Sequence, residues 1–332
     1  MHLITPTVEW VPQDPGLEGI YKQIEKVGRS CWASENLITE GSAEPFVENL
    51  KKNKHGAPLE HGTVYLYLTH TSPATDVHYW DTRKVIDKYL KNEYSRVYQN
   101  TFDEFKYNAY ITTNMRVLVE NDWLDDLQYL CNEPTTYHPV RLTYHFTCQR
   151  AISAEFNRHR KNSPMESSSR YCNYSLDKFG NELNICPSQW VEDKWIDINS
   201  QEPHDAITDN LEYSNKGLEN YCYEIANGQE DSMSVVDFWW FANLACEFSY
   251  MNMIKHKVKP EQARDILPLD LKTELYHTAY LSDWLHFCDL RAWKSKGNKP
   301  HPEAIRIAKP VYDNLVWQGY IKPGYMTKKM MN

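Results

Sequence analysis

The segment Arg141–Cys148 constrains the fold more than any other part of the 332-residue chain. Its side chains alternate strictly, with Leu142, Tyr144, Phe146 and Cys148 on one face and polar residues on the other. Because successive side chains of a β-strand point to opposite sides, the alternation predicts a strand with one buried face and one open face.

The remaining elements are predicted from periodicity and from capping residues. Thr63–Leu68 is rich in β-formers and predicts a second strand. Helices are expected over residues 81–98, 149–160, 203–227, 234–256, 261–267, 283–290 (with Ser282 as N-cap) and 302–319 (with a kink at Pro310). Residues 175–202 suggest a long loop with short elements. Strands and helices are segregated rather than alternating, which indicates an α+β fold.

Composition narrows the function classes. The formal net charge of -9 argues against a general nucleic-acid binder, because such proteins gain affinity by neutralising phosphates. The eight cysteines are scattered and are expected to be reduced thiols. The chain shows neither a signal peptide nor an apolar run of membrane-spanning length, so a soluble, cytoplasmic protein is expected.

Aromatic residues predict burial or association. Four of them are consecutive at Phe238–Phe241, and on a helix they would point in all directions. We therefore expect either deep burial or a subunit interface there. The 23 tyrosines and 11 tryptophans of the chain favour an oligomer, because both residue types are enriched at interfaces.

The densest polar stretch runs from Asn157 to Tyr171. Three consecutive basic residues, Arg158, His159 and Arg160, cannot share one face of a helix, but they can converge at a helix end. The pair Ser163–Pro164 provides that end, since proline disfavours helical geometry in the residue before it. The stretch suits recognition of a phosphorylated small molecule, although a solvated basic helix end is an equally good interpretation.

Three further clusters carry polar groups. His55 and His61 flank a glutamate before the predicted strand. Contact with a cofactor ring, a metal site or a simple strand-entry turn would each fit, although the spacing is not that of a helical zinc site. Arg264 and Arg291 each lie among apolar residues. A buried arginine needs an acceptor for its hydrogen bonds. Two such arginines, in addition to the polar stretch, favour an anionic ligand.

These segments together resemble the flavin-dependent thymidylate synthase (ThyX) family. Arg158-His159-Arg160, seven residues and then Ser168 match its R-H-R-x7-S signature. Residues 29–32, 55–61, 263–269 and 285–291 resemble other family segments, in family order. The resemblance implies one ThyX-like catalytic domain over residues 1–332, with a central antiparallel or mixed sheet, long helices, a large helical insertion at about 70–140 and a second insertion at about 175–205.

The resemblance also implies the reaction and its ligands. dUMP would be methylated to dTMP with methylenetetrahydrofolate as carbon donor and FAD, reduced by NADPH, as hydride source. Arg291 would activate the uracil ring without a cysteine nucleophile. The sites would be shared between subunits of a homotetramer, with no metal, membrane or nucleic-acid polymer involved.

Site residues are assigned by the same resemblance. The residues expected to bind dUMP are Glu155, Arg158, Glu166, Ser167, Ser168, Ser169, Arg170, Arg264 and Arg291. The residues expected to bind FAD are His55, Ala57, Arg158, His159, Arg160, Glu166, Tyr280, Ser282 and His286.

Several residues depart from the family pattern. Met165 stands where asparagine is usual, and Glu155 where glutamine is often found. Ala57, Tyr280 and Ser282 also replace more usual residues near the flavin. Two competing interpretations are a different flavin- or nucleotide-dependent transferase on the same scaffold, and a nucleotide- or RNA-binding regulator that uses residues 158–170.

Overall fold

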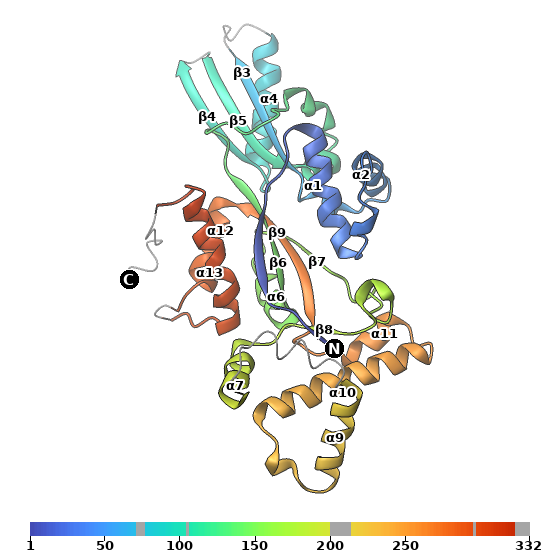
Figure 1. Cartoon of the computed structure of the whole chain (residues 1–332). Coiled ribbons are helices and arrows are strands. Elements are labelled where there is room, and N and C mark those ends of the chain that lie inside the picture. Colours follow the sequence, from blue (N-terminus) through green and yellow to red (C-terminus); the bar gives the residue numbers. More distant parts are fainter. Residues whose placement is uncertain (71–76, 104–105, 200–213, 295–296, 323–332) are drawn as a thin grey trace.

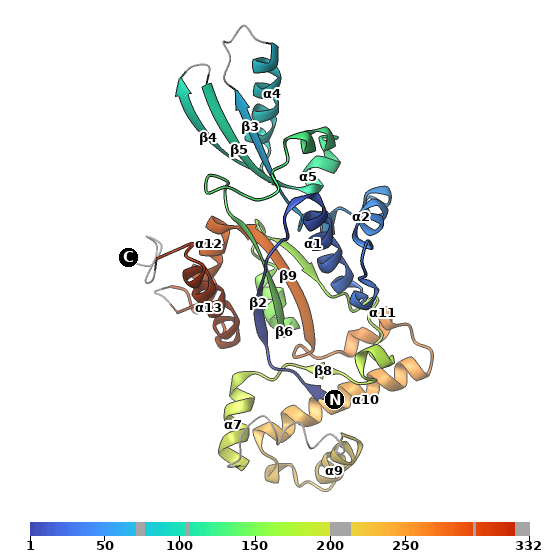
Figure 2. The same cartoon turned by 45° about the horizontal axis from the view of Figure 1, so that its top comes forward.

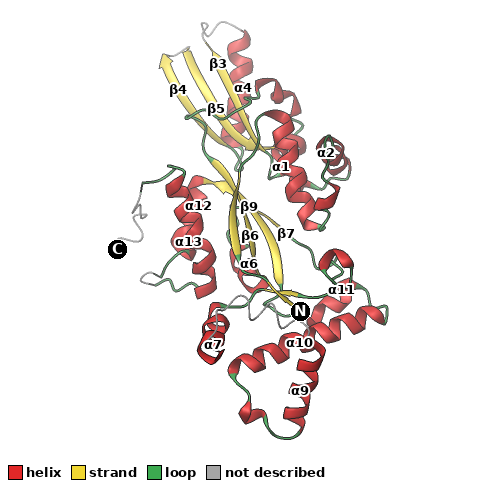
Figure 3. Cartoon of the chain, in the orientation of Figure 1, coloured by secondary structure: helices red, strands yellow, loops and turns green. Residues whose placement is uncertain are grey.

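The computed structural model describes residues 1–70, 77–103, 106–199, 214–294 and 297–322. The molecule is elongated (Figures 1 and 2), with a three-stranded sheet at one end, a four-stranded sheet in the middle and a group of helices at the other end. The two larger sheets are antiparallel and are flanked by many helices (Figure 3), but helices lie between most consecutive strands along the chain, so strands and helices are not segregated as predicted.

The central sheet has the strand order β2-β6-β9-β7, and all its pairs are antiparallel. Its strands are β2 (Thr7–Val11), β6 (Arg141–Gln149), β9 (Lys272–Tyr280) and β7 (Ser163–Glu166). The strand predicted at 141–148 is confirmed as β6, whereas β7 and β9 were not predicted.

Three helices cover one face of this sheet: α6 (Arg150–Phe156), α12 (Leu281–Arg291) and α13 (Pro302–Trp317). The apolar side of β6 meets them, with Phe146 lying 5.3 Å from Phe156 between ring centroids. The expectation of an open polar face on β6 is wrong in its first half. Arg141 and Thr143 are buried, because their polar groups bond to Thr63 and to Thr278 of β9.

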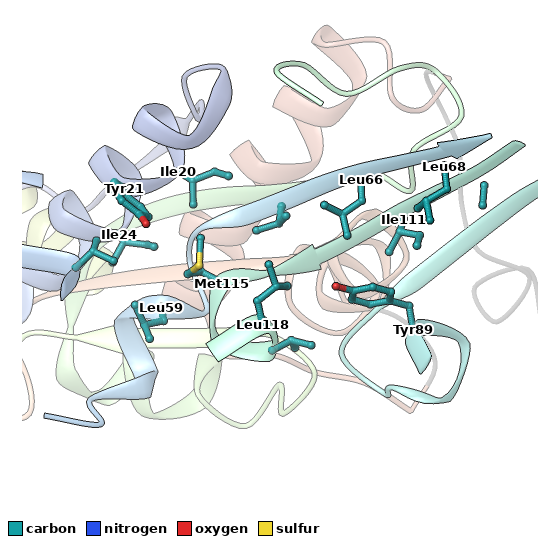
Figure 4. Close-up of a cluster of buried hydrophobic side chains, with 14 of the residues drawn as sticks. Ile20, Tyr21, Ile24, Leu59, Leu66, Leu68, Tyr89, Ile111, Met115 and Leu118 are labelled. Carbon is teal, nitrogen blue, oxygen red and sulfur yellow. The ribbon is translucent and has the colours of Figure 1, made fainter. Parts of the chain in front are cut away.

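The second sheet, of order β3-β5-β4, lies at the end of the molecule. It consists of β3 (Thr63–His70), β5 (Lys106–Asn114) and β4 (Arg96–Asp103), and it confirms the strand predicted at 63–68. The helices around it are α1 (Gly16–Cys31), α2 (Ala43–Lys52), α3 (Gly56–Leu59), α4 (Val77–Lys91) and α5 (Met115–Glu120). Figure 4 shows its core, in which Ile20 and Ile24 of α1 pack with side chains of β3, β5 and α5.

Residues 70–140, which were expected to form a large helical insertion, are not helical throughout. The helix predicted over 81–98 ends at Lys91, and Arg96 begins β4, which pairs with β5. Asn92 closes the turn between them by accepting bonds from the backbone of Tyr94 and from the Ser95 hydroxyl. Such an asparagine turn lets a helix stop and a strand begin within four residues.

Two buried side chains join the sheets. Arg141 of β6 donates to the hydroxyl of Thr63 (2.9 Å) and to the carbonyl oxygen of Glu60 (2.9 Å). Tyr280, the last residue of β9, donates to the carbonyl oxygen of Thr112 on β5 (2.6 Å). The two sheets are thus tied by polar contacts where β9 passes into α12.

The other end of the molecule is mostly helical. It contains β1 (His2–Leu3) paired in parallel with β8 (Asn184–Ile185), together with α7 (Gln189–Asn199), α9 (Ser214–Ala226), α10 (Val235–Lys255) and α11 (Pro260–Ala263). A capping box formed by Ser234 and Asp237 begins α10. The helix predicted over 203–227 begins at 214 within the described residues, and residues 200–213 lie outside them.

The aromatic run on α10 is not deeply buried within one chain. Phe238 is 45% exposed, and Trp239, Trp240 and Phe241 are half-buried. The prediction of burial inside the chain is wrong for these residues, and the prediction of an interface stays open. None of the described helices is both long enough and apolar enough to cross a bilayer.

Two helix boundaries near the polar stretch also differ from prediction. The helix expected over 149–160 ends at Phe156, because the side chain of Asn157 and the following turn make tertiary contacts. The N-cap of α12 is Tyr280 rather than Ser282, so that Ser282 lies inside the first turn. Pro260 and Pro302 begin α11 and α13 as predicted, and Pro310 lies inside α13.

Candidate active site

Helix α6 and the turn after it separate two polar clusters. Residues four apart on a helix share a face, and residues two apart point about 200° away from each other. Ser153 and Asn157 therefore face one way, toward Glu166, whereas Glu155 and His159 face Arg291. We call these the Glu166 cluster (Arg150, Ser153, Asn157, Glu166, Thr273) and the Arg291 cluster (Glu155, His159, His286, Arg291).

In the Arg291 cluster, three acceptors hold one guanidinium. Arg291, the last residue of α12, forms an ion pair with the Glu155 carboxylate through Nη1. Its Nη2 donates to the carbonyl oxygen of Glu155 (3.0 Å), and its Nε donates to Nε2 of His159 (3.2 Å). The arginine side chain is 16% exposed, so part of this fixed side chain is accessible to solvent.

His159 is held neutral in this cluster. Burial, with the positive charge of Arg291 and the neighbouring His286, lowers the pKa of His159 to about 4. Since Nε2 accepts from Arg291, the neutral ring carries its proton on Nδ1. The ring also packs edge-on against Phe287 at 4.9 Å, which fixes its orientation.

The Glu166 cluster saturates one carboxylate with donors. Ser153 donates to Oε1 (2.7 Å), Thr273 donates to Oε1 (3.0 Å) and Asn157 donates to Oε2 (2.9 Å). Arg150 adds a longer contact at 3.4 Å. Glu166, predicted to touch both dUMP and FAD, is thereby anchored to α6 and β9.

His277 extends this cluster into the core, and sequence reasoning did not single it out. Its Nδ1 lies 3.3 Å from Nδ2 of Asn162, and its Nε2 lies 3.2 Å from Oδ1 of Asn157. If amide nitrogens donate and amide oxygens accept, the chain of bonds runs from Asn162 through His277 and Asn157 to Glu166. The spacing of Ser153 and Asn157 on α6 was the signal that could have revealed these partners.

After Glu166 the chain turns toward the end of α1. The backbone N–H of Ser168 donates to the carbonyl oxygen of Cys31 (3.0 Å), and the Ser167 hydroxyl donates to that of Ser30 (3.2 Å). The predicted Ser167–Arg170 segment therefore lies beside residues 29–32, as expected if both belong to one site. His55 is also nearby, since its ring is 6.5 Å from that of Trp32.

Four predicted arginines offer cationic groups without an anionic partner. Within the described ranges, no carboxylate lies within ion-pair distance of Arg158, Arg160, Arg170 or Arg264. Arg158, Arg160 and Arg170 are exposed, and Arg264 is half-buried. Free guanidinium groups of this kind suit phosphate oxygens, which they can contact through two parallel bonds.

The remaining predicted residues lie apart from the two clusters. Ala57 is in α3, and Arg264 begins the turn after α11. Figures 1 and 2 place α11 and α12 on opposite sides of the molecule. Tyr280 is directed toward the three-stranded sheet, and Ser282 lies in the first turn of α12.

His55 and His61, for which a metal site was one interpretation, make different contacts. His61 is fully buried and bonds to the Thr278 hydroxyl through Nδ1 (2.7 Å), while His55 lies at the helix start beside Trp32. No set of three or more His, Cys, Asp or Glu side chains in the described part of the chain is arranged to hold a metal ion.

Comparison with known protein families identifies the family of this chain. The family model of thymidylate synthase complementing proteins, Thy1, matches residues 81–316. The chain belongs to the Thy1 family. These are flavin-dependent thymidylate synthases, so the chain is an enzyme, a methyltransferase of the thymidylate synthase type. The match includes both polar clusters, whereas residues 29–32 and 55–61 precede it.

Two solved structures are also similar to this Thy1 protein. Both are of the UMP/dUMP methylase PolB from Streptomyces cacaoi. The form with 5-Br dUMP is 15% identical with a TM-score of 0.40 and covers 96% of this chain and 93% of its own. The form with 5-Br UMP is 14% identical with a TM-score of 0.37 and covers 95% and 91%. No curated protein matches the chain.

Proposed function

We propose that this Thy1 protein converts dUMP to dTMP, with methylenetetrahydrofolate as the carbon donor and NADPH-reduced FAD as the source of hydride. The observation that carries the proposal is the fixed guanidinium of Arg291, held by Glu155 and His159 inside the residues matched by the family. A donor fixed in advance stabilises charge that develops during reaction without having to reorganise.

Arg291 is the proposed activating group for uracil. Its two remaining Nη hydrogens are available to the edge of a pyrimidine, where they would favour the enolate-like form of the ring. That form makes C5 nucleophilic without a covalent bond to the enzyme. The thiols next to the Ser167–Arg170 segment fit this route, because burial raises the pKa of Cys31 to about 11 and also raises that of Cys172.

The unpaired arginines support binding of two phosphorylated ligands. The residues proposed to bind dUMP are Ser167, Ser168, Ser169, Arg170 and Arg264, together with Glu155, Arg158 and Glu166. The residues proposed to bind FAD are His55, Ala57, Arg158, His159, Arg160, Glu166, Tyr280, Ser282 and His286. Exposed Arg158 and Arg160 provide the charge that a pyrophosphate needs. When bound, the flavin would deliver hydride equivalents.

The separation of the predicted residues supports a site shared between subunits. Helix α11, which Arg264 follows, and helix α12, which Arg291 ends, lie on opposite sides of one chain (Figures 1 and 2). The aromatic residues 238–241 of α10 are exposed or half-buried. A homotetramer would bring such residues of different chains together. We propose this assembly for the single ThyX-like domain of residues 1–332.

Release of tritium from [5-³H]dUMP tests the function. Tritium should be released only with folate and NADPH present, together with formation of dTMP, and the purified protein should carry the yellow colour of a flavin. A colourless protein that takes up no FAD and releases no tritium would refute the proposal.

Replacement of Arg170 by alanine should mainly weaken dUMP binding. The variant loses a charged donor to phosphate, so the dissociation constant should rise about 10- to 100-fold, as expected for a charge-assisted bond worth about 1.5–3 kcal/mol. Titration calorimetry measures the change. The control is Arg83→Ala on α4, a half-buried arginine paired with Asp87. Equal affinities in the two variants would contradict the role of Arg170.

A further inference from the structure

The turn that carries the R-H-R signature is attached at both of its ends to a single imidazole ring. The turn covers residues 157–162, between the end of α6 and the start of β7. Asn157 is its first residue and Asn162 its last. Their amide groups lie 3.2 Å and 3.3 Å from the two ring nitrogens of His277 on β9, one asparagine at each nitrogen. His277 therefore spans the whole turn.

The directions of these hydrogen bonds follow from Glu166. Nδ2 of Asn157 donates to Oε2 of Glu166 (2.9 Å), so Oδ1 of Asn157 is left to face His277. An amide oxygen only accepts, so the proton of the His277 ring is on Nε2, and Nδ1 accepts from Nδ2 of Asn162. Burial, with His159 nearby, lowers the pKa of His277 to about 3. The neutral ring, with one donor and one acceptor, thus satisfies both asparagines.

Side chains of the turn divide into an inner and an outer set. Asn162 and His159 are buried, and Asn157 is half-buried. Arg158 and Arg160 are exposed. The inner side chains anchor the turn, and the outer ones present two guanidinium groups. A turn fixed in advance lowers the conformational cost of binding one ligand through both groups.

The inner side chains use two anchoring residues, and only one of them is independent of the substrate. His159 bonds to Arg291, the guanidinium proposed to act on uracil. His277, by contrast, is fully buried, and its ring centroid lies 6.0 Å from that of Phe146 and 6.3 Å from that of Trp284. Close packing among core side chains holds the His277 ring in place whether or not a ligand is bound.

We propose that His277 is a positioning residue that bridges Asn157 and Asn162 and so holds the R-H-R turn in the conformation that binds FAD. This inference rests on the proposed function, which supplies the ligand of Arg158 and Arg160. Without the bridge, the turn would populate other conformations, and the apparent dissociation constant of FAD would rise as the competent fraction falls. His277 acts through the turn and not by contact with the flavin.

Two substitutions of His277 separate the bridge from core packing. His277→Leu keeps an apolar side chain beside Phe146 and Trp284 but has no polar atom, so both contacts to the asparagines are lost. His277→Gln supplies one amide N–H group and one amide oxygen, which replace Nε2–H and Nδ1.

The matched control is His138→Leu. His138 is 3% exposed, and its ring lies between those of Tyr65 and Tyr110 at 5.4 Å and 5.3 Å. Its ring nitrogens contact the backbone N–H of Thr135 (3.0 Å) and the carbonyl oxygen of Leu66 (3.1 Å), next to the three-stranded sheet. The control therefore removes an equally buried, doubly bonded imidazole that has no contact with the R-H-R turn.

Trypsin cleavage of the folded protein measures the turn itself. Arg158, Arg160 and Lys161 are exposed and provide cleavage sites inside the turn. Cleavage requires local opening, so its rate reports how firmly the turn is held. In His277→Leu this rate should rise about 10- to 30-fold, as expected for the loss of two neutral hydrogen bonds. It should stay near the wild-type rate in His277→Gln and His138→Leu, and mass spectrometry identifies the cut.

Fluorescence titration with FAD measures the consequence for binding. The dissociation constant should rise in His277→Leu by about the same factor as the cleavage rate and return to the wild-type value in His277→Gln. His138→Leu should bind FAD as the wild type does. Urea unfolding of the two leucine variants checks that their overall stabilities are comparable.

The outcomes distinguish this inference from the proposed function. Wild-type protein that binds no FAD would overturn the proposed function and, with it, the role of the turn. If the wild type binds FAD but the turn is cleaved no faster in His277→Leu than in His138→Leu, the inference alone is wrong. A looser turn with unchanged FAD affinity also refutes it. Asn162→Ala removes one end of the bridge outside the core, so it should shift both measurements in the same direction, by less, and it replaces His277→Leu if that variant does not fold.

Discussion

Replacing Arg291 by alanine should abolish dTMP formation while FAD stays bound. Removing one fixed donor from developing charge typically costs about 100- to 1000-fold in rate, and Arg291 is the only group proposed to activate the ring. Tritium release from [5-³H]dUMP measures the rate, and visible absorbance measures the flavin. Glu155 is then left unpaired, but its partial exposure allows water to solvate it, so the fold should survive.

Arg306→Ala is the matched control for this experiment. Arg306 also lies in a helix and pairs with a glutamate at 3.0 Å, but it bridges α13 and α7 and belongs to neither polar cluster. It should retain most of the activity. Native rates of dTMP formation in Arg291→Ala would show that the ring is activated elsewhere.

The folded protein should lose stability steeply as the pH falls below about 6.5. Three histidines are buried in neutral form: burial lowers the pKa of His159 to about 4, that of His277 to about 3 and that of His61 well below its usual value. The unfolded chain binds protons at these positions below pH 6.5 and the folded chain does not. Their contribution to stability is therefore present above pH 6.5 and declines toward the folded-state pKa values.

The size of this effect is large. Each unit of pKa difference corresponds to about 1.36 kcal/mol. At pH 4.5 the two neutral histidines, His159 and His277, should together lower the free energy of unfolding by about 5 kcal/mol. Whole domains are stable by only about 5–15 kcal/mol. Asp270 and Asp283, whose pKa values are raised by burial, act in the opposite direction. Urea unfolding at pH values from 8 to 4.5 measures the balance.

A single variant isolates one of these protons. His277→Gln can keep contacts to Asn157 and Asn162 but cannot titrate, so the slope of unfolding free energy against pH should fall by about one proton. The control substitution is His256→Gln, at an exposed helix end. A wild-type stability that is flat between pH 6.5 and pH 4.5 would contradict the prediction.

Local patterns predicted the strands β3 and β6 and the helix α10 well, because each carries its signal in its own residues. Alternation marks β6, and Ser234 with Asp237 begins α10. The helix predicted through Arg160 stops at Phe156 for a reason that periodicity does not contain. Asn157 leaves the helical pattern to bond with Glu166 and His277, which are distant in sequence.

The sequence allowed a candidate site to be proposed as a set of residues, but it did not predict their arrangement. The R-H-R signature identified Arg158, His159 and Arg160, and residue types alone suggested an anionic ligand. Only the fold shows that Glu155 faces Arg291 from 136 positions away while Glu166 is enclosed by Ser153 and Thr273. The strand β4 was missed, although Arg96–Tyr98 contains the β-branched and aromatic residues typical of strands.

The hydroxyl of Tyr280 has a mechanical consequence for the opposite end of α12. Tyr280 caps this helix, and its bond to Thr112 fastens the cap to β5. Arg291 ends the same helix, about 16 Å away at 1.5 Å per residue. A shift of α12 along its axis would stretch the hydrogen bond between Tyr280 and Thr112. The three-stranded sheet thereby helps to fix the position of the Arg291 guanidinium.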